Sequence, residues 1–184
     1  LTVAGKKGTE TNKAKLDVIY ILDKSGSMKE DFGGTSKRIA ASNAITALTK
    51  SLKQNANIDA RFSMVTFSGN KTTGMWGQGD TKTWDDAEVA VSWTTDAGTI
   101  ERGSKPTSNG GTNYQAGIRT AKELLTSKRA GAMTAVIFIS DGDPTFYYNP
   151  DGYTRGDGNN DGNGGADNLK VCLDAAKNEI ANLG

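Results

Sequence analysis

Two short apolar runs stand out in the hydrophobic pattern of this chain, and a carboxylate closely follows each of them. They are Leu16–Leu22, which precedes Asp23, and Ala135–Ile139, which precedes Ser140 and Asp141. Short runs rich in β-branched and aromatic residues are typical of strands that are buried on both faces. We therefore predict two buried strands, with Asp23 and Asp141 at or just beyond their carboxyl ends.

The remaining periodic segments predict two further strands and three helices. Ile58–Phe67 alternates and predicts the second strand, and Glu88–Trp93 predicts a third at the edge of the sheet. Apolar residues at helical spacing predict one helix from a cap at Thr35 or Ser36 to about Gln54, one that Asn113 caps and that ends near Lys128–Gly131, and one over about Leu169–Leu183. The first of these helices is expected to pack on the sheet.

Composition and charge are those of one globular domain. The 184 residues are 35% hydrophobic and 23% charged, which is enough chain to bury a core. The 22 basic residues nearly balance the 21 acidic ones, for a net charge of +1, and no block of like charge stands out. We therefore expect neither nucleic acid nor an anionic membrane as a partner.

Targeting signals and disulfides are not expected within these residues. The single cysteine, Cys172, cannot form an internal disulfide and lies on the apolar face of a predicted helix, so we expect a buried thiol. No run approaches the roughly 20 apolar residues of a membrane span, so we expect no direct membrane insertion. Residues 1–15 lack the apolar core of a signal peptide, so any export or anchoring signal is expected outside this sequence.

Oxygen-bearing side chains follow the predicted strands in a pattern that suits a metal ion. Asp23, Ser25 and Ser27 alternate directly after the first strand, Thr112 follows two glycines, and Asp141 follows the later strand. In open α/β sheets, ligands bind outside the carboxyl ends of the strands. Hard oxygen ligands without His or Cys favour Mg²⁺, Mn²⁺ or Ca²⁺. The alternative for the first loop alone is a Ser/Gly turn that caps the next helix.

Taken together, these five residues resemble the metal-ion-dependent adhesion site of von Willebrand factor A-type domains, whose pattern is D-x-S-x-S, a distant Thr and a later Asp. The resemblance implies a doubly wound, mainly parallel α/β sheet flanked by helices, of Rossmann-like form. It also implies that all five residues hold the ion, that Asp141 switches between direct and water-mediated ligation, and that a partner's Asp or Glu fills the open coordination position.

The weak periodicity of residues 1–15 and the resemblance together set expected domain limits. Residues 1–15 are interpreted as a lead-in or linker, and residues 16–184 as the A-type domain. Members of that family continue with further strands and a closing helix, so we expect this chain to be C-terminally incomplete relative to the family.

The amino-acid sequence of the first strand and its metal loop is similar to that of A-type domains of Gram-positive pilus-tip and surface adhesins. This similarity implies a secreted virulence protein of the cell wall or pilus, with other pilus subunits and a host or extracellular-matrix protein as partners. Two alternatives stay open. One is an intracellular A-type domain that recruits partners in a chelatase or AAA-type assembly, and the other is a purely structural metal ion that only holds the loops together. The chain has no His, which removes Ser/His and Cys/His catalytic pairs, so we expect no enzyme.

Two long loops carry further hypotheses. The loop after Asp141 contains Asp157, Asn159 and Asp161, which match the opening of a calcium loop, whereas position twelve is Asn168 instead of Glu. A second site for Ca²⁺ is one interpretation, and the alternative, which composition favours, is a flexible loop with solvated aspartates. We expect the Arg-Gly-Asp triplet at 155–157 not to be an integrin motif. The aromatic residues of loop 68–86 are expected either to pack on the domain or to face a partner.

Overall fold

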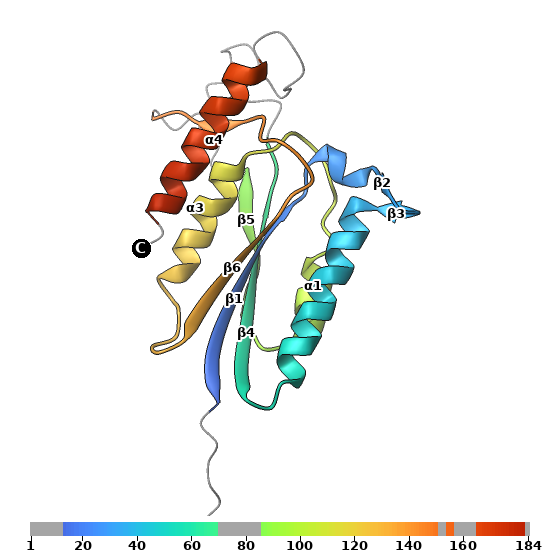
Figure 1. Ribbon diagram of the computed structural model, residues 1–184, viewed down its shortest axis with the longest axis vertical. Coiled ribbons are helices and arrows are strands. Elements are labelled where there is room, and N and C mark those ends of the chain that lie inside the picture. The colour runs from blue at the N-terminus through green and yellow to red at the C-terminus, as the bar shows by residue number, and fades with distance from the viewer. Residues whose placement is uncertain (1–12, 70–85, 151–153, 157–164, 183–184) are drawn as a thin grey trace, which may run out of the picture.

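A four-stranded, mainly parallel sheet forms the centre of the protein (Figure 1). The structure is a computed structural model that describes residues 13–69, 86–150, 154–156 and 165–182. The strand order is β5-β4-β1-β6, with β1 (Ala14–Asp23) parallel to both β4 (Ile58–Phe67) and β6 (Met133–Ile139). The fourth strand, β5 (Ala87–Thr94), runs antiparallel to β4 at the edge. This arrangement confirms the predicted α/β fold.

Helices cover both faces of the sheet (Figure 1). Helices α1 (Lys37–Gln54) and α2 (Ala97–Gly103) pack on one face, while α3 (Tyr114–Leu125) covers the other with α4 (Gly165–Ala181) beside it. The Ser36 hydroxyl accepts the Ile39 amide at 3.3 Å, and the Asn113 side chain accepts the Ala116 amide at 3.1 Å. Both side chains satisfy amides of a first helical turn, which confirms the predicted caps.

The central strand β1 has a hydrophobic core on each of its faces, as predicted. Its alternate residues Val18, Tyr20 and Leu22 pack with residues that include Ile45 of α1 and Ile100 of α2. Ile19 and Ile21 pack on the opposite face with Val65, Phe67 and Ala121. Because both faces of β1 are covered, packing on both sides fixes where its carboxyl end lies at the edge of the sheet.

Strand β6 differs from the prediction of a strand buried on both faces. Val136 is 39% exposed and Phe138 is 37% exposed. Among the residues that the structure describes, β6 pairs with β1 alone, so it forms an edge of the sheet. An apolar run predicts that a strand forms but does not say how many neighbours cover it, which is why the prediction was wrong here.

Several element bounds also differ from those predicted. Strand β1 begins at Ala14, so Ala14 and Lys15 belong to the sheet and not to the lead-in, and α4 begins at Gly165, earlier than predicted. The short elements not predicted are α2, the 3-10 helix η1 (Gly26–Lys29), the hairpin of β2 (Asp31–Phe32) and β3 (Thr35–Ser36), and the pair β7 (Tyr147–Tyr148) and β8 (Thr154–Arg155). Cys172 is buried, as predicted. No helix within the described ranges is long and apolar enough to cross a membrane.

A buried ion cluster lies near the amino end of β1, away from the predicted metal site. The Asp17 carboxylate is fully buried, and its two oxygens accept hydrogen bonds from the Arg61 guanidinium at 2.9 and 2.7 Å. The Arg129 amide and its Nε each donate to the same carboxylate at 2.8 Å. Burial raises the pKa of Asp17, but the bonds from Arg61 and Arg129 outweigh it and lower the pKa to about 2.

Candidate metal centre

Asp23, the last residue of β1, is a fully buried carboxylate with neutral donors on both oxygens. One oxygen accepts the Ser25 amide at 2.6 Å, and the other accepts the Ser140 hydroxyl at 2.5 Å. Burial raises the pKa of Asp23, donors on Ser140 and Ser25 offset part of that effect, and the charge of Asp141 raises the pKa further. A carboxylate held in this way gains from a cation placed beside it.

A chain of hydrogen bonds joins the two predicted strand-end sites. The hydroxyls of Ser25 and Ser27 lie 3.1 Å apart, and the Ser27 hydroxyl donates to the Asp141 carboxylate at 2.9 Å. Four of the five predicted ligands, Asp23, Ser25, Ser27 and Asp141, are therefore connected directly. They meet because β1 and β6 are adjacent parallel strands whose carboxyl ends reach the same edge.

The fifth predicted ligand, Thr112, lies in a loop that is hydrogen-bonded both to the serine loop after β1 and to the loop after Asp141. The Gly26 amide donates to the Gly110 carbonyl at 2.9 Å, which ties the Thr112 loop to the serine loop. On its other side, the Thr112 carbonyl accepts the amides of Thr145 at 2.8 Å and Phe146 at 2.9 Å. Thr112 is also largely buried. Three loops thus form one backbone-bonded unit around the five residues.

Gly110 has a packing role in this unit. Its φ is +79°, and a Cβ added there would lie 2.3 Å from the carbonyl oxygen of Gly69. What the structure describes is the close approach of one loop to another.

Replacing Gly110 with alanine is expected to lower the free energy of unfolding by about 3 kcal/mol, because a strained φ and a backbone clash add together. Gly131 is a matched control, since its φ is +72° and an added Cβ would meet nothing within 4 Å. Gly131→Ala is expected to lose only about 1 kcal/mol. Urea unfolding of both variants in EDTA measures the difference, and equal losses would contradict the packing role.

Two residues beside the centre were missed by sequence reasoning, namely Ser140 and Lys37. Ser140 donates to Asp23, and its position next to Asp141 is a signal that could have found it. The ammonium group of Lys37 lies 2.9 Å from Asp141 and 2.7 Å from Glu30. Lys37 is 104 residues from Asp141, and no local pattern predicts their contact.

The residues present fit a hard divalent cation. Within the described part of the chain, no three His, Cys, Asp or Glu side chains form a metal-binding group. The groups that are connected at this centre are the carboxylates of Asp23 and Asp141 and the hydroxyls of Ser25 and Ser27. Such oxygen donors suit Mg²⁺ or Mn²⁺ and disfavour softer ions that select sulfur. The Lys37 ammonium already places a positive charge on Asp141, which is the place where a cation would be attracted.

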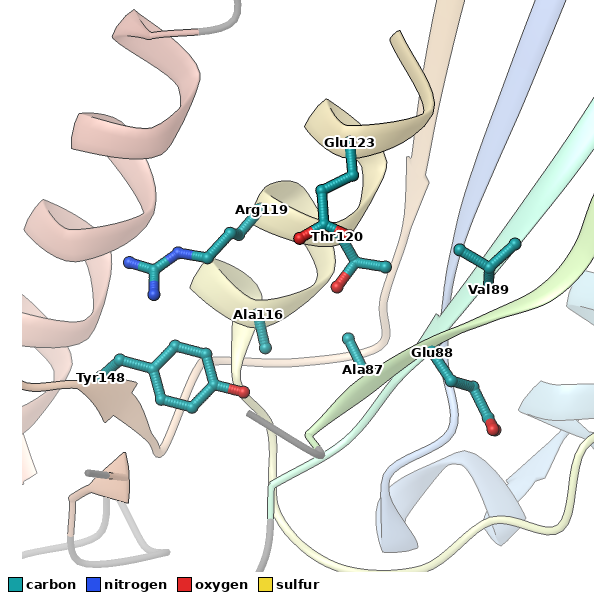
Figure 2. Close-up of a pocket in the computed structure, with 8 residues that line it drawn as sticks. All are labelled: Ala87, Glu88, Val89, Ala116, Arg119, Thr120, Glu123 and Tyr148. Atoms are coloured by element: carbon teal, nitrogen blue, oxygen red, sulfur yellow. The ribbon is translucent and has the colours of Figure 1, made fainter. Parts of the chain in front are cut away.

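A separate pocket of about 580 Å³ lies between β5, α3 and Tyr148 (Figure 2). Arg119 on its wall donates to Glu179 of α4 at 2.8 Å and lies over the Tyr148 ring at 5.2 Å. None of the five predicted ligands lines this pocket. Arg119 therefore connects α3 to α4, whereas Glu88, which also lines the pocket, pairs with Lys24 of the serine loop at 2.6 Å. The hypotheses on Asp157, Asn159 and Asp161, on Asp157 of the Arg-Gly-Asp triplet, and on residues 70–85 lie outside the described residues.

The sequence model of the von Willebrand factor type A domain matches residues 17–155, a span that holds all five residues of the centre. The chain belongs to this family. None of the curated proteins matches this A domain in sequence.

Solved structures of bacterial pilus proteins share the fold. The vWF domain of the type V pili tip protein Mfa5 from Porphyromonas gingivalis has a TM-score of 0.56 and 16% identity, over 74% of this chain and 40% of that one. The PilB minor pilin from Streptococcus sanguinis has a TM-score of 0.57 and 20% identity, over 74% and 32%. The pilus adhesin SpaC from Lactobacillus rhamnosus GG has a TM-score of 0.58 and 21% identity, over 79% and 19%. This A domain spans less than half the length of each of these chains.

Proposed function

We propose that this A domain is a metal-dependent adhesion module that binds an acidic group of a host or matrix protein. Asp23, Ser25, Ser27, Thr112 and Asp141 would hold Mg²⁺ or Mn²⁺ in this role. The observation that carries the proposal is the hydrogen-bonded chain from Ser25 through Ser27 to Asp141, next to the buried Asp23. When bound, the ion supplies a positive charge and an open position for a partner's carboxylate.

The donor types explain why the site suits binding. Asp23 and Asp141 together balance the charge of a divalent ion, whereas the serines and the threonine are neutral and leave its attraction for a further anion intact. The domain would bind ligand as a component of an extracellular pilus or surface adhesin, together with other subunits. This setting is supported by the pilus proteins that share the fold. We further propose that the domain is not an enzyme, since no His is present to pair with a nucleophile.

Binding to a panel of immobilised matrix proteins is expected to occur in Mg²⁺ and to be lost in EDTA. Thr112→Val replaces the hydroxyl of a buried residue with a methyl group of similar size, so it is expected to keep the fold and to weaken the Mg²⁺-dependent binding about tenfold. Serum albumin on the same surface is the negative control. Binding that persists in EDTA would mean that loop residues, and not the metal ion, contact the partner. If Thr112→Val has lower thermal stability in Mg²⁺ but unchanged binding to the matrix proteins, the result would favour a purely structural metal ion that only holds the loops together.

A further inference from the structure

Lys37, the first residue of α1, places a positive charge inside the metal centre. Its Nζ lies 2.9 Å from Oδ2 of Asp141 and 2.7 Å from Oε2 of Glu30. The three side chains differ in access to solvent, with Asp141 7% exposed, Lys37 25% and Glu30 63%. The ammonium therefore bridges a buried carboxylate of the centre and an exposed carboxylate outside it.

The contact with Asp141 is selective. Asp141 uses Oδ1 for the Ser27 hydroxyl and Oδ2 for Lys37, while both oxygens of Asp23 accept neutral donors. The lysine within the serine loop, Lys24, turns to Glu88 at 2.6 Å instead. Among the ion pairs of the described residues, Lys37 alone joins a cation to one of the five predicted ligands.

Glu30 is placed so that Lys37 can change partners with little movement. The Lys37 amide donates to the Glu30 carbonyl at 3.0 Å, which fixes the two backbones side by side. Rotation of the lysine side chain can thus exchange Asp141 for Glu30 alone while the backbone stays in place. Because Glu30 is well exposed, its pairing with Lys37 carries little of the desolvation cost that a buried pair has.

We propose that Lys37 is a built-in competitor that sets the affinity of the centre for its divalent cation. Its ammonium neutralises Asp141 in the ion-free protein, and it moves to Glu30 when Asp141 turns to the ion. This inference rests on the proposed function, because it takes the five residues to be the ion's ligands. The physical basis is that two positive charges within a few ångströms repel each other strongly in a partly buried site.

Lys37→Met is expected to bind Mg²⁺ about tenfold more tightly than the wild type, by isothermal titration calorimetry. This corresponds to about 1.4 kcal/mol. The effect is limited to this size because in the wild type Glu30 remains a partner for the ammonium when Asp141 turns to the ion. In EDTA the same variant is expected to melt at a lower temperature, since Asp141 loses its cation while still buried. The rise in melting temperature on adding Mg²⁺ is therefore expected to be larger than in the wild type.

Two control variants isolate the position of the charge. Lys37→Arg keeps the positive charge and is expected to stay within about threefold of wild-type affinity. Lys50→Met removes the same charge from the same helix, roughly 20 Å farther along the axis, and is expected to leave Mg²⁺ binding unchanged.

The outcomes separate this inference from the function on which it rests. If the wild type binds Mg²⁺ and Lys37→Met binds it equally or more weakly, Lys37 is a support for Asp141 and the inference is overturned while the proposed function stands. If neither the wild type nor Lys37→Met binds Mg²⁺ or Mn²⁺, both fail. A tighter Lys37→Met with unchanged Lys50→Met supports both.

Discussion

Replacing Asp17 with asparagine is expected to lower the free energy of unfolding by about 3 kcal/mol, because it leaves Arg61 and Arg129 facing a neutral, fully buried group. Asparagine keeps the size of the side chain, so the loss comes from charge and hydrogen bonding. Urea unfolding at pH 7 measures it. Asp59→Asn is the matched control, since the Asp59 side chain pairs with the same Arg129 but is 47% exposed, and it is expected to cost less than about 1 kcal/mol.

The pH dependence of the wild type provides a second test of the same cluster. The folded protein holds the pKa of Asp17 at about 2, below its ordinary value of 3.8, so the folded state favours the charged form. The resulting stabilisation, on the order of 2 kcal/mol, is complete above about pH 4 and is lost as the pH falls toward 2. Asp17→Asn is expected to lack this component. If the free energies of unfolding of the variant and the wild type change in parallel down to pH 2, Asp17 does not contribute this stabilisation.

Replacing Asp23 with asparagine is expected to weaken Mg²⁺ binding at least a hundredfold, or about 2.7 kcal/mol, while leaving the ion-free fold as stable as the wild type or more so. The charge of Asp23 is costly without an ion, because burial disfavours the charged form and the Ser25 amide and Ser140 hydroxyl that donate to it are neutral. Asparagine keeps an acceptor for the Ser25 amide, and the Ser140 hydroxyl can rotate to accept. Calorimetry with Mg²⁺ and thermal melting in EDTA measure the two effects.

Asp143 supplies the control for Asp23. It lies two residues beyond Asp141 and is exposed, so Asp143→Asn removes the same charge from the same rim without removing a predicted ligand. Its Mg²⁺ affinity is expected to stay within about threefold of the wild type. Equal losses in both variants would mean that overall negative charge, and not ligation by Asp23, attracts the ion. A clear loss of stability of Asp23→Asn in EDTA would show that the carboxylate has a structural role.

Features with a local cause could be predicted from the sequence. Ser36 and Asn113 cap helices because a short polar side chain precedes a periodic segment, and that pattern is contained in a few residues. The same holds for β1 and β4, whose residues face the two cores in strict alternation. The grouping of Asp23 with Asp141 could also be predicted, because adjacent parallel strands must end at one edge.

Features that depend on distant neighbours could not be predicted. The seven residues of helix α2 bury little besides Ile100, so they show no apolar period that predicts a helix. Its N-cap, Asp96, is the one local signal that could have indicated it. The exposure of Val136 and Phe138 depends on which elements lie beside β6, and an apolar run does not predict those neighbours. The contact of Lys37 with Asp141 arises only when α1 and the segment after β6 lie close in space. Residues beside a site are therefore harder to predict than the ligands themselves.

The central place of β1 has a mechanical consequence. A partner held at Asp23 and a pull applied at Ala14 would load this strand along its own axis. Its hydrogen bonds to β4 follow it from Ala14 to Asp23, and β6 brackets it from Leu16 to Leu22 on the other side. Such a load acts on the two parallel ladders in shear, so their bonds resist together and do not open one after another. If the proposed adhesive role holds, a pulling force on the bound partner would therefore be transmitted through the centre of the sheet.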